Sequence, residues 1–232
     1  MIKKIINVPQ PFLAVFPPLW LLGFALLVGA DLASKKVITD NLRFHLSYSQ
    51  VVQNQPIAPE MEEFLLNRTE KIDLLGEDGR FIKFRLVFND RFAFSLGPSN
   101  SLLGFFISFF AIIFLLFYRL HNPELGPRWA WLLIFSGAFG NLIDKMFVKS
   151  IVNGEWVLSL VPVHGHVSGV VDFIECIWFG VNQWSAIPVL SVFSWESWPT
   201  FNIADSCVTV GIGLLLIYML RGEASVAAEN KA

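Results

Sequence analysis

The sequence predicts an integral membrane protein that is mainly α-helical: a bundle of four transmembrane helices with a small extracytoplasmic β-sheet and an interfacial segment. Of the 232 residues, 54% are hydrophobic and only 16% are charged. The mean hydropathy of +0.57 is too high for a soluble domain. The apolar residues also gather in runs long enough to cross a bilayer. We therefore expect one integral membrane domain over residues 1–232.

The first apolar run, Ile5–Ala30, contains no charged residue and follows two lysines. A secretory signal peptide cleaved after Ala30 is an alternative, but its apolar region would cover only about 7–15 residues. We therefore expect an uncleaved helix over about residues 10–31, entering from the cytoplasm, where the lysines stay. At its outer end, in the motif DLASK, Asp31 and Lys35 stand four positions apart on one helical face and can pair.

Residues 32–98 are expected outside the cytoplasm. The stretch Asp40–Gly79 is polar and shows no recognisable chemistry. The segments KIDLL and RFIKFRLVF, with a turn at Gly76–Gly79 between them, predict a β-hairpin. In the second segment, apolar residues alternate with Lys83 and Arg85. We expect its apolar face to meet lipid or the first helix and its basic face to lie near lipid phosphates.

The second and third spans are expected at about residues 99–119 and 128–146. The charge-free run Phe92–Tyr118 is closed by Arg119, and the short connection HNPELGPR follows. Short loops that carry arginine belong in the cytoplasm.

The third run is short, so Asp144 and Lys145 at its end must lie close to the outer face of the membrane. Within this run, Gly137 and Gly140 let another backbone approach closely.

Residues 147–200 are expected outside, and the last span at about 201–221, with a polar tail inside. Both termini are then cytoplasmic. Cys176–Trp195 also lacks charge, so a fifth span is the alternative. Its amides, proline, serines and tryptophans are more typical of an interfacial segment than of a hydrocarbon core.

Two aspartates stand in apolar surroundings where a carboxylate is costly: Asp172 in GVVDF and Asp205 in FNIADS. Asp205 can carry chemistry, cap the last helix or pair with a lysine. Four spans bring Asp31, Asp144, Asp172 and Asp205 to the outer face at similar depth, whereas a fifth span would separate the last two.

An asparagine accompanies an acid in two of these motifs. Asn141 precedes Asp144, and Asn202 precedes Asp205, by three positions each, so each pair shares one helical face.

Several kinds of chemistry do not fit the sequence. GHVSG around Ser168 departs by one residue from a serine-protease pattern, HExxH is absent, and the two cysteines form no CxxC pair. We expect no metal and no cofactor. The net charge of −2 indicates no nucleic-acid partner.

Two carboxylates at one interface fit acid/base hydrolysis, because close like charges share a proton. The alternative is a polytopic transport or binding protein that uses the clustered acids as an ion or ligand site. Transporters place such acids nearer the midplane and usually contain internal repeats, and we find no repeat.

The segments DLASK, NDRFAFSLG, GAFGNLIDK, VVDF and FNIADS, in this order, resemble the five sequence blocks of the lipoprotein signal peptidase (signal peptidase II) family. The resemblance implies an aspartic endopeptidase of the bacterial inner membrane. Such an enzyme removes the signal peptide of diacylglyceryl-modified prolipoproteins, cutting before the lipidated cysteine. Globomycin-type antibiotics would occupy its active site at the outer face, and membrane phospholipid would surround it.

By the same resemblance, Asp172 and Asp205 would be the catalytic pair. The residues that would bind substrate or support the site are Asp31, Lys35, Asn89, Gly137, Asn141, Asp144, Lys145 and Asn202.

The chain departs from the family pattern in a few places. Arg91 stands where the family usually shows glycine, and Lys145 where it usually shows arginine. The stretches Asp40–Gly79 and Ser150–Thr200 are longer than usual. We expect these differences to affect the outer lid rather than the aspartate pair.

Overall fold

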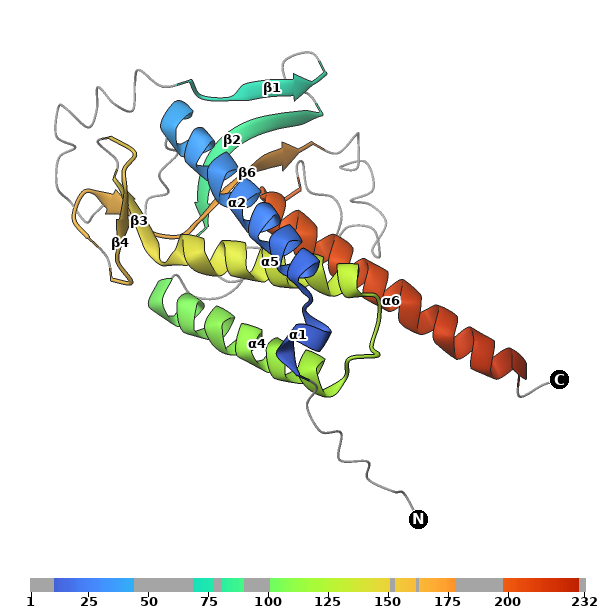
Figure 1. Ribbon diagram of the computed structural model, residues 1–232. Coiled ribbons are helices and arrows are strands. Elements are labelled where there is room, and N and C mark those ends of the chain that lie inside the picture. Colours follow the sequence, from blue (N-terminus) through green and yellow to red (C-terminus); the bar gives the residue numbers. More distant parts are fainter. Residues whose placement is uncertain are drawn as a thin grey trace. The chain divides into compact units, whose positions relative to one another are not determined.

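The structure is a computed structural model that describes residues 11–43, 69–76, 81–89, 101–150, 153–161, 163–177 and 198–229. Its elements, labelled in Figure 1 where there is room, are α1 (Phe12–Val15), α2 (Pro18–Asn41), β1 (Ile72–Leu75), β2 (Ile82–Asn89), α4 (Ser101–His121), α5 (Arg128–Lys145), β3 (Phe147–Ser150), β4 (Trp156–Leu158), β5 (His166–Val167), β6 (Val170–Cys176) and α6 (Ile203–Glu229).

The chain divides into two compact units. The first contains Met1–Asp31, Phe106–Leu142 and Ile203–Ala232, and the second contains Leu32–Phe105 and Ile143–Asn202. The first unit is helical, and both sheets belong to the second unit.

Prolines shape the beginning of the described chain. Phe16 ends α1 with φ −122° and ψ 78°, outside the helical region that a residue before proline avoids. Pro18 then opens α2, where its fixed φ suits the first helical position. The helix continues past residue 31, the expected end of the first span, to Asn41. The polar residues end the apolar run but not the helix, because Lys36 and Asp40 pair at 2.6 Å across one turn.

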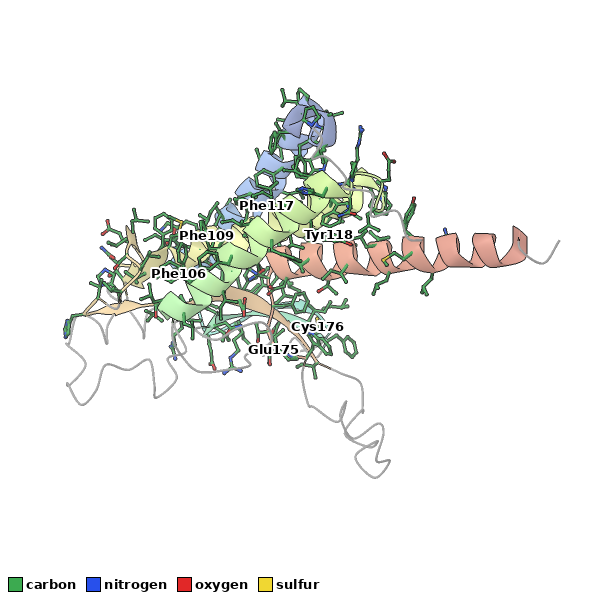
Figure 2. The ribbon with its side chains drawn as sticks, turned by 90° about the horizontal axis from the view of Figure 1, so that it is seen from below. Phe106, Phe109, Phe117, Tyr118, Glu175 and Cys176 are labelled. Atoms are coloured by element: carbon green, nitrogen blue, oxygen red, sulfur yellow. The ribbon has the colours of Figure 1, made fainter. Side chains whose placement is uncertain are left out.

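Among the described helices, two are long and apolar enough to cross a membrane: Leu102–His121 in α4 and Ile203–Arg221 in α6. Only 17% and 22% of these windows are buried within the protein, whereas the core helix of a soluble protein would be mostly buried. Figure 2 shows labelled aromatic side chains along α4, among them Phe106 and Phe117, which are 44% and 59% exposed. Such surfaces fit contact with lipid.

Aromatic side chains form the core of the first unit. Phe16 meets Phe135 edge to face, with ring centroids 5.7 Å apart, and Val15 and Trp131 complete the buried cluster. The Trp131 indole donates a hydrogen bond to the Leu125 carbonyl at 2.6 Å. A buried indole N–H needs such a partner, so the bond ties the α4–α5 connection to the core.

Helices α5 and α6 approach each other closely at glycines. A Cβ at Gly137 would lie 2.2 Å from the Ala204 carbonyl oxygen, and one at Gly211 would lie 2.8 Å from that of Ala130. Backbone atoms cannot move aside as a side chain can. The expectation that Gly137 allows another backbone to approach is therefore confirmed.

Gly137→Ala should destabilise the protein by about 1–3 kcal/mol, because the added methyl forces α5 away from α6. Gly29→Ala is the matched control, since a Cβ on this other helical glycine meets nothing within 4 Å. Thermal unfolding in detergent measures both. Equal melting temperatures for the two variants would contradict the packing argument.

The predicted β-hairpin is confirmed in the second unit, where β1 pairs antiparallel with β2. The structure adds β6 as a third strand in the order β1-β2-β6. Lys83 and Arg85 on β2 lie 3.4 and 4.0 Å from the Glu175 carboxylate on β6. The basic face therefore has an acidic partner that the hairpin sequence did not supply.

A second sheet, in the order β4-β3-β5, was not predicted from the sequence. Its strands are short. Gly154 lies between β3 and β4, and Gly165 lies directly before β5, each with a φ of 71°. Most of the predicted interfacial segment, and Arg91, lie outside the described residues.

Candidate functional site

Asp205 lies in the first turn of α6. Its Oδ1 accepts a hydrogen bond of 2.7 Å from the Asn141 side-chain amide on α5. The positive end of the helix dipole favours an acid at this position. The Asp205 carboxylate is thus held by a neutral donor, the Asn141 amide, and by the N-terminal end of α6.

Asp31, at the midpoint of α2, is only 1% exposed. Its Oδ1 accepts a hydrogen bond of 2.9 Å from the Ala204 backbone N–H. The first N–H groups of a helix have no partner inside the helix. Asp31 supplies one from a distant part of the sequence and so anchors the start of α6.

Asp172 lies on β6 and is 2% exposed. Two amides hold its carboxylate: Asn202 Nδ2 donates to Oδ1 at 2.7 Å, and Asn89 Nδ2 donates to Oδ2 at 3.1 Å. Asp172 lies opposite Val87 of β2. Asn89 stands two residues after Val87, so its side chain is on the same face of the sheet as that of Asp172. The register of the sheet therefore positions this contact.

Backbone pairing places Asn202 beside β6. The Phe201 carbonyl accepts hydrogen bonds from Phe173 N and Ile174 N at 3.0 and 2.8 Å, and Phe201 N donates to the Ile174 carbonyl at 3.1 Å. Asn202 itself is fully buried. Its amide is thus fixed next to Asp172 by the strand-like residue before it.

Asp144, at the end of α5, is fully buried between two lysines. Its Oδ2 lies 3.3 Å from Lys35 Nζ, and Lys149 pairs with its Oδ1. The Val171 backbone N–H also donates to Oδ2 at 2.8 Å. Since Val171 directly precedes Asp172, Asp144 anchors the strand that carries Asp172.

Lys149 is a site-supporting residue that the sequence analysis missed. Its fully buried ammonium donates to the carbonyls of Gly169, Asp144 and Phe147 at 2.7, 3.0 and 3.1 Å, and lies 4.9 Å from the Trp156 ring. Burial lowers the pKa of Lys149, while the Asp144 carboxylate opposes that shift. A lysine within the apolar stretch MFVKS is the signal that would have pointed to it.

Lys145 occupies a different place from Lys149. It is partly exposed, and its ammonium lies 3.5 Å from the Gly104 carbonyl oxygen. Lys145, which the family resemblance singled out, is thus next to Asp144 in sequence but contacts Gly104. The ion pairs with Asp144 are made by Lys149 and Lys35 instead.

Apart from Lys145, which contacts Gly104 within the second unit, the predicted site residues fall into two groups, one in each unit. The first unit brings together Asp31, Gly137, Asn141 and Asp205. The second brings together Lys35, Asn89, Asp144, Asp172 and Asn202, with Lys149 added. Within the described ranges, no three His, Cys, Asp or Glu residues are arranged to hold a metal ion.

Lys149→Met should lower the free energy of unfolding by about 3–5 kcal/mol, because removing one member of a buried ion pair leaves charge uncompensated. Lys36→Met is the control. Lys36 belongs to an exposed pair whose side chains are 46% and 41% exposed, so its loss should cost under about 1 kcal/mol. Chemical unfolding of the purified protein compares them, and equally small effects would remove Lys149 from this anchor.

A model of the family described as signal peptidase (SPase) II matches residues 23–221. The chain belongs to the signal peptidase II family. The resemblance drawn from five short blocks is thereby confirmed, and membership makes the chain a peptidase. The matched range includes every predicted site residue, from Asp31 to Asp205, and also Lys149.

Relatives of this signal peptidase II family member carry the name lipoprotein signal peptidase. One from Leptospira biflexa is 36% identical over 211 residues, covering 90% of this chain and 92% of its own. One from Borrelia hermsii is 33% identical over 157 residues, covering 66% of this chain and 74% of its own. One from Treponema denticola is 33% identical over 158 residues, covering 64% and 73%.

A solved bacterial membrane enzyme shares the fold of this family member. The match has a TM-score of 0.55 at 20% sequence identity and covers 90% of this chain and 92% of the other. The combination of helices with small sheets is therefore a fold that this solved enzyme also has.

Proposed function

We propose that this member of the signal peptidase II family is an intramembrane aspartic endopeptidase. Its substrates are diacylglyceryl-modified prolipoproteins, and it cuts the signal peptide before the lipidated cysteine. Family membership, with relatives named lipoprotein signal peptidase, supports the substrate class. The observation that carries the catalytic assignment is that asparagine amides donate hydrogen bonds to the carboxylates of both Asp172 and Asp205.

The kind of partner matters because a neutral amide orients a carboxyl group without adding charge. A carboxyl group held in this way can exist with or without its proton, as acid/base catalysis requires. Asp144 differs, because two lysines surround it. We therefore assign Asp144 to holding the site and Asp172 and Asp205 to proton transfer.

The chain itself supports joint action of the two aspartates. Asn202, which binds Asp172, stands only three positions before Asp205. We propose that the two carboxyl groups face the scissile peptide together and share one proton, as close carboxylates do.

In this mechanism the ionised aspartate takes a proton from water as the water oxygen bonds to the scissile carbonyl carbon. The protonated aspartate gives its proton to the carbonyl oxygen. When the tetrahedral intermediate collapses, the hydroxyl proton returns to that aspartate and the C–N bond breaks. The first aspartate passes its proton to the leaving nitrogen, so the pair regains its starting state.

The other predicted residues support this centre in the proposal. Asp31, Gly137 and Asn141 position the start of α6 and its aspartate. Lys35 and Asp144 position β6. Lys145 binds a substrate backbone carbonyl, and globomycin-type inhibitors occupy the same site.

We further propose that α2, α4, α5 and α6 cross the bacterial inner membrane as four spans of a single domain. Residues 32–98 and 147–200 then lie outside, both termini lie in the cytoplasm, and the aspartates work at the outer face. The apolar, exposed windows of α4 and α6 support two of these spans. Arg119, His121 and Arg128 near the α4–α5 connection support its cytoplasmic side.

Asp172→Asn and Asp205→Asn should each lower cleavage of a purified lipidated prolipoprotein at least about a hundredfold, since each removes a group that transfers a proton. The native protein should show a bell-shaped pH profile, because the pair titrates as a unit. A gel-shift assay measures turnover. Asp40→Asn, at an exposed acid on α2, is the control and should keep it. Near-native turnover by Asp172→Asn, with unchanged melting, would overturn the assignment.

The topology has its own test. With Cys176 and Cys207 replaced by serine, a cysteine at Ser185 should react with a membrane-impermeant maleimide added outside intact cells. A cysteine at the exposed Glu124 should react only after the membrane is opened. The opposite pattern would contradict the proposed orientation while leaving the catalytic assignment to the cleavage assay.

A further inference from the structure

The first unit contains a cavity of about 510 Å³ at one end of its helices. The cavity is lined by Arg119 of α4, Glu124 of the connection to α5, Arg128 at the start of α5 and Tyr218 of α6, together with Ala14 and Val15 of α1. None of these residues belongs to the proposed catalytic centre. Two cations and one acid give the cavity a net positive charge.

Arg119 is the unusual member of this cavity. Its side chain is 2% exposed, and its Nη1 donates to the carbonyls of Leu125 and Asn122 at 3.0 and 3.3 Å. Its buried Nε donates to no atom, and no carboxylate forms an ion pair with it in the part of the chain that the structure describes. Glu124 lines the same cavity but lies beyond ion-pair distance of Arg119. A buried cation without a direct ion-pair partner is costly, and a guanidinium suits a phosphate group in particular.

The far side of α1 faces a second cavity, of about 260 Å³, that is wholly apolar. Phe12 and Phe16 line this cavity, while Ala14 and Val15, between them in sequence, line the cationic one. On α4, Leu116 lines the apolar cavity and Arg119 the cationic one, one helical turn apart. A ligand that fills both has a negative head and an apolar tail.

The depth of the cationic cavity agrees with such a ligand. The two apolar windows, Leu102–His121 and Ile203–Arg221, end close to Arg119 and Tyr218. The cavity therefore lies where apolar helix gives way to polar connection, which is the level of lipid headgroups. Basic pockets between helices at this level bind anionic lipid heads.

We propose that this cavity is a binding site for an anionic phospholipid. Arg119 and Arg128 bind the headgroup phosphate, Tyr218 lines the entrance, and an acyl chain occupies the aromatic cavity beyond α1. The assignment goes beyond the proposed peptidase function and uses no residue of its catalytic centre.

Native mass spectrometry tests this site. The purified full chain in detergent is first incubated with phosphatidylglycerol or with phosphatidylcholine. Phosphatidylglycerol should be retained in preference. Arg119 is buried, so its replacement risks misfolding, and the exposed Arg128 is the better probe. Arg128→Gln should weaken phosphatidylglycerol binding about fivefold, the effect of one cation near anionic lipid.

Glu124→Gln should strengthen binding by a similar factor, because it removes the acid from the cavity. Arg221→Gln is the matched control: it removes an exposed arginine near the same end of α6 that does not line the cavity. Equal losses in Arg128→Gln and Arg221→Gln, or equal retention of the two lipids, would overturn the site. Displacement of phosphatidylglycerol by millimolar inorganic phosphate would instead indicate a free-anion site and would overturn the lipid assignment.

Prolipoprotein cleavage, measured on the same variants in excess detergent, separates this inference from the proposed function. Arg128→Gln and Glu124→Gln should cleave at the native rate. Loss of cleavage in either variant, with folding unchanged, would mean that the cavity belongs to the catalytic machinery and would overturn its assignment as a separate site.

Discussion

The second unit depends on one buried charge cluster: the Asp144 carboxylate between the ammonium groups of Lys35 and Lys149. Removing three charges from water is expensive, and the attraction between them only partly offsets the cost. In return, the cluster fixes the position of the beginning of β6. Lys149 binds the Gly169 carbonyl, and Asp144 binds the Val171 N–H, so α2, α5 and β3 all hold the beginning of β6. Asp172 follows at the next residue.

The carboxylates of this protein differ in what surrounds them. Asp144 meets lysines, Asp31 meets a helix N–H, and Asp172 and Asp205 meet asparagine amides. Lysine partners favour an anion, whereas a neutral amide orients a carboxyl group in either protonation state. This difference in partners separates Asp144 from the proposed catalytic pair more sharply than their common apolar surroundings do.

Several features followed from local sequence. The hairpin from Ile72 to Asn89 was predicted because alternation of apolar and charged residues is a local signal. The close approach at Gly137 was predicted because only glycine lacks a Cβ. The family was recognised because five short blocks occur in the right order. The second sheet was missed, since strands of two to four residues acquire stability only from partners distant in sequence. Lys149 was missed because it lies outside the five blocks, although its partner Asp144 stands only five residues earlier in one of them.

The sequence by itself determined that the protein is an apolar, helical membrane protein of the signal peptidase II family, and it singled out Asp172 and Asp205. These conclusions rest on composition and on residues close together in the chain. Only the tertiary structure decided which donor meets which carboxylate, that β6 joins the hairpin, and that Arg119 lies buried beside a cavity with no ion-pair partner among the described residues. Each of these depends on contacts between residues far apart in sequence, which no local pattern encodes.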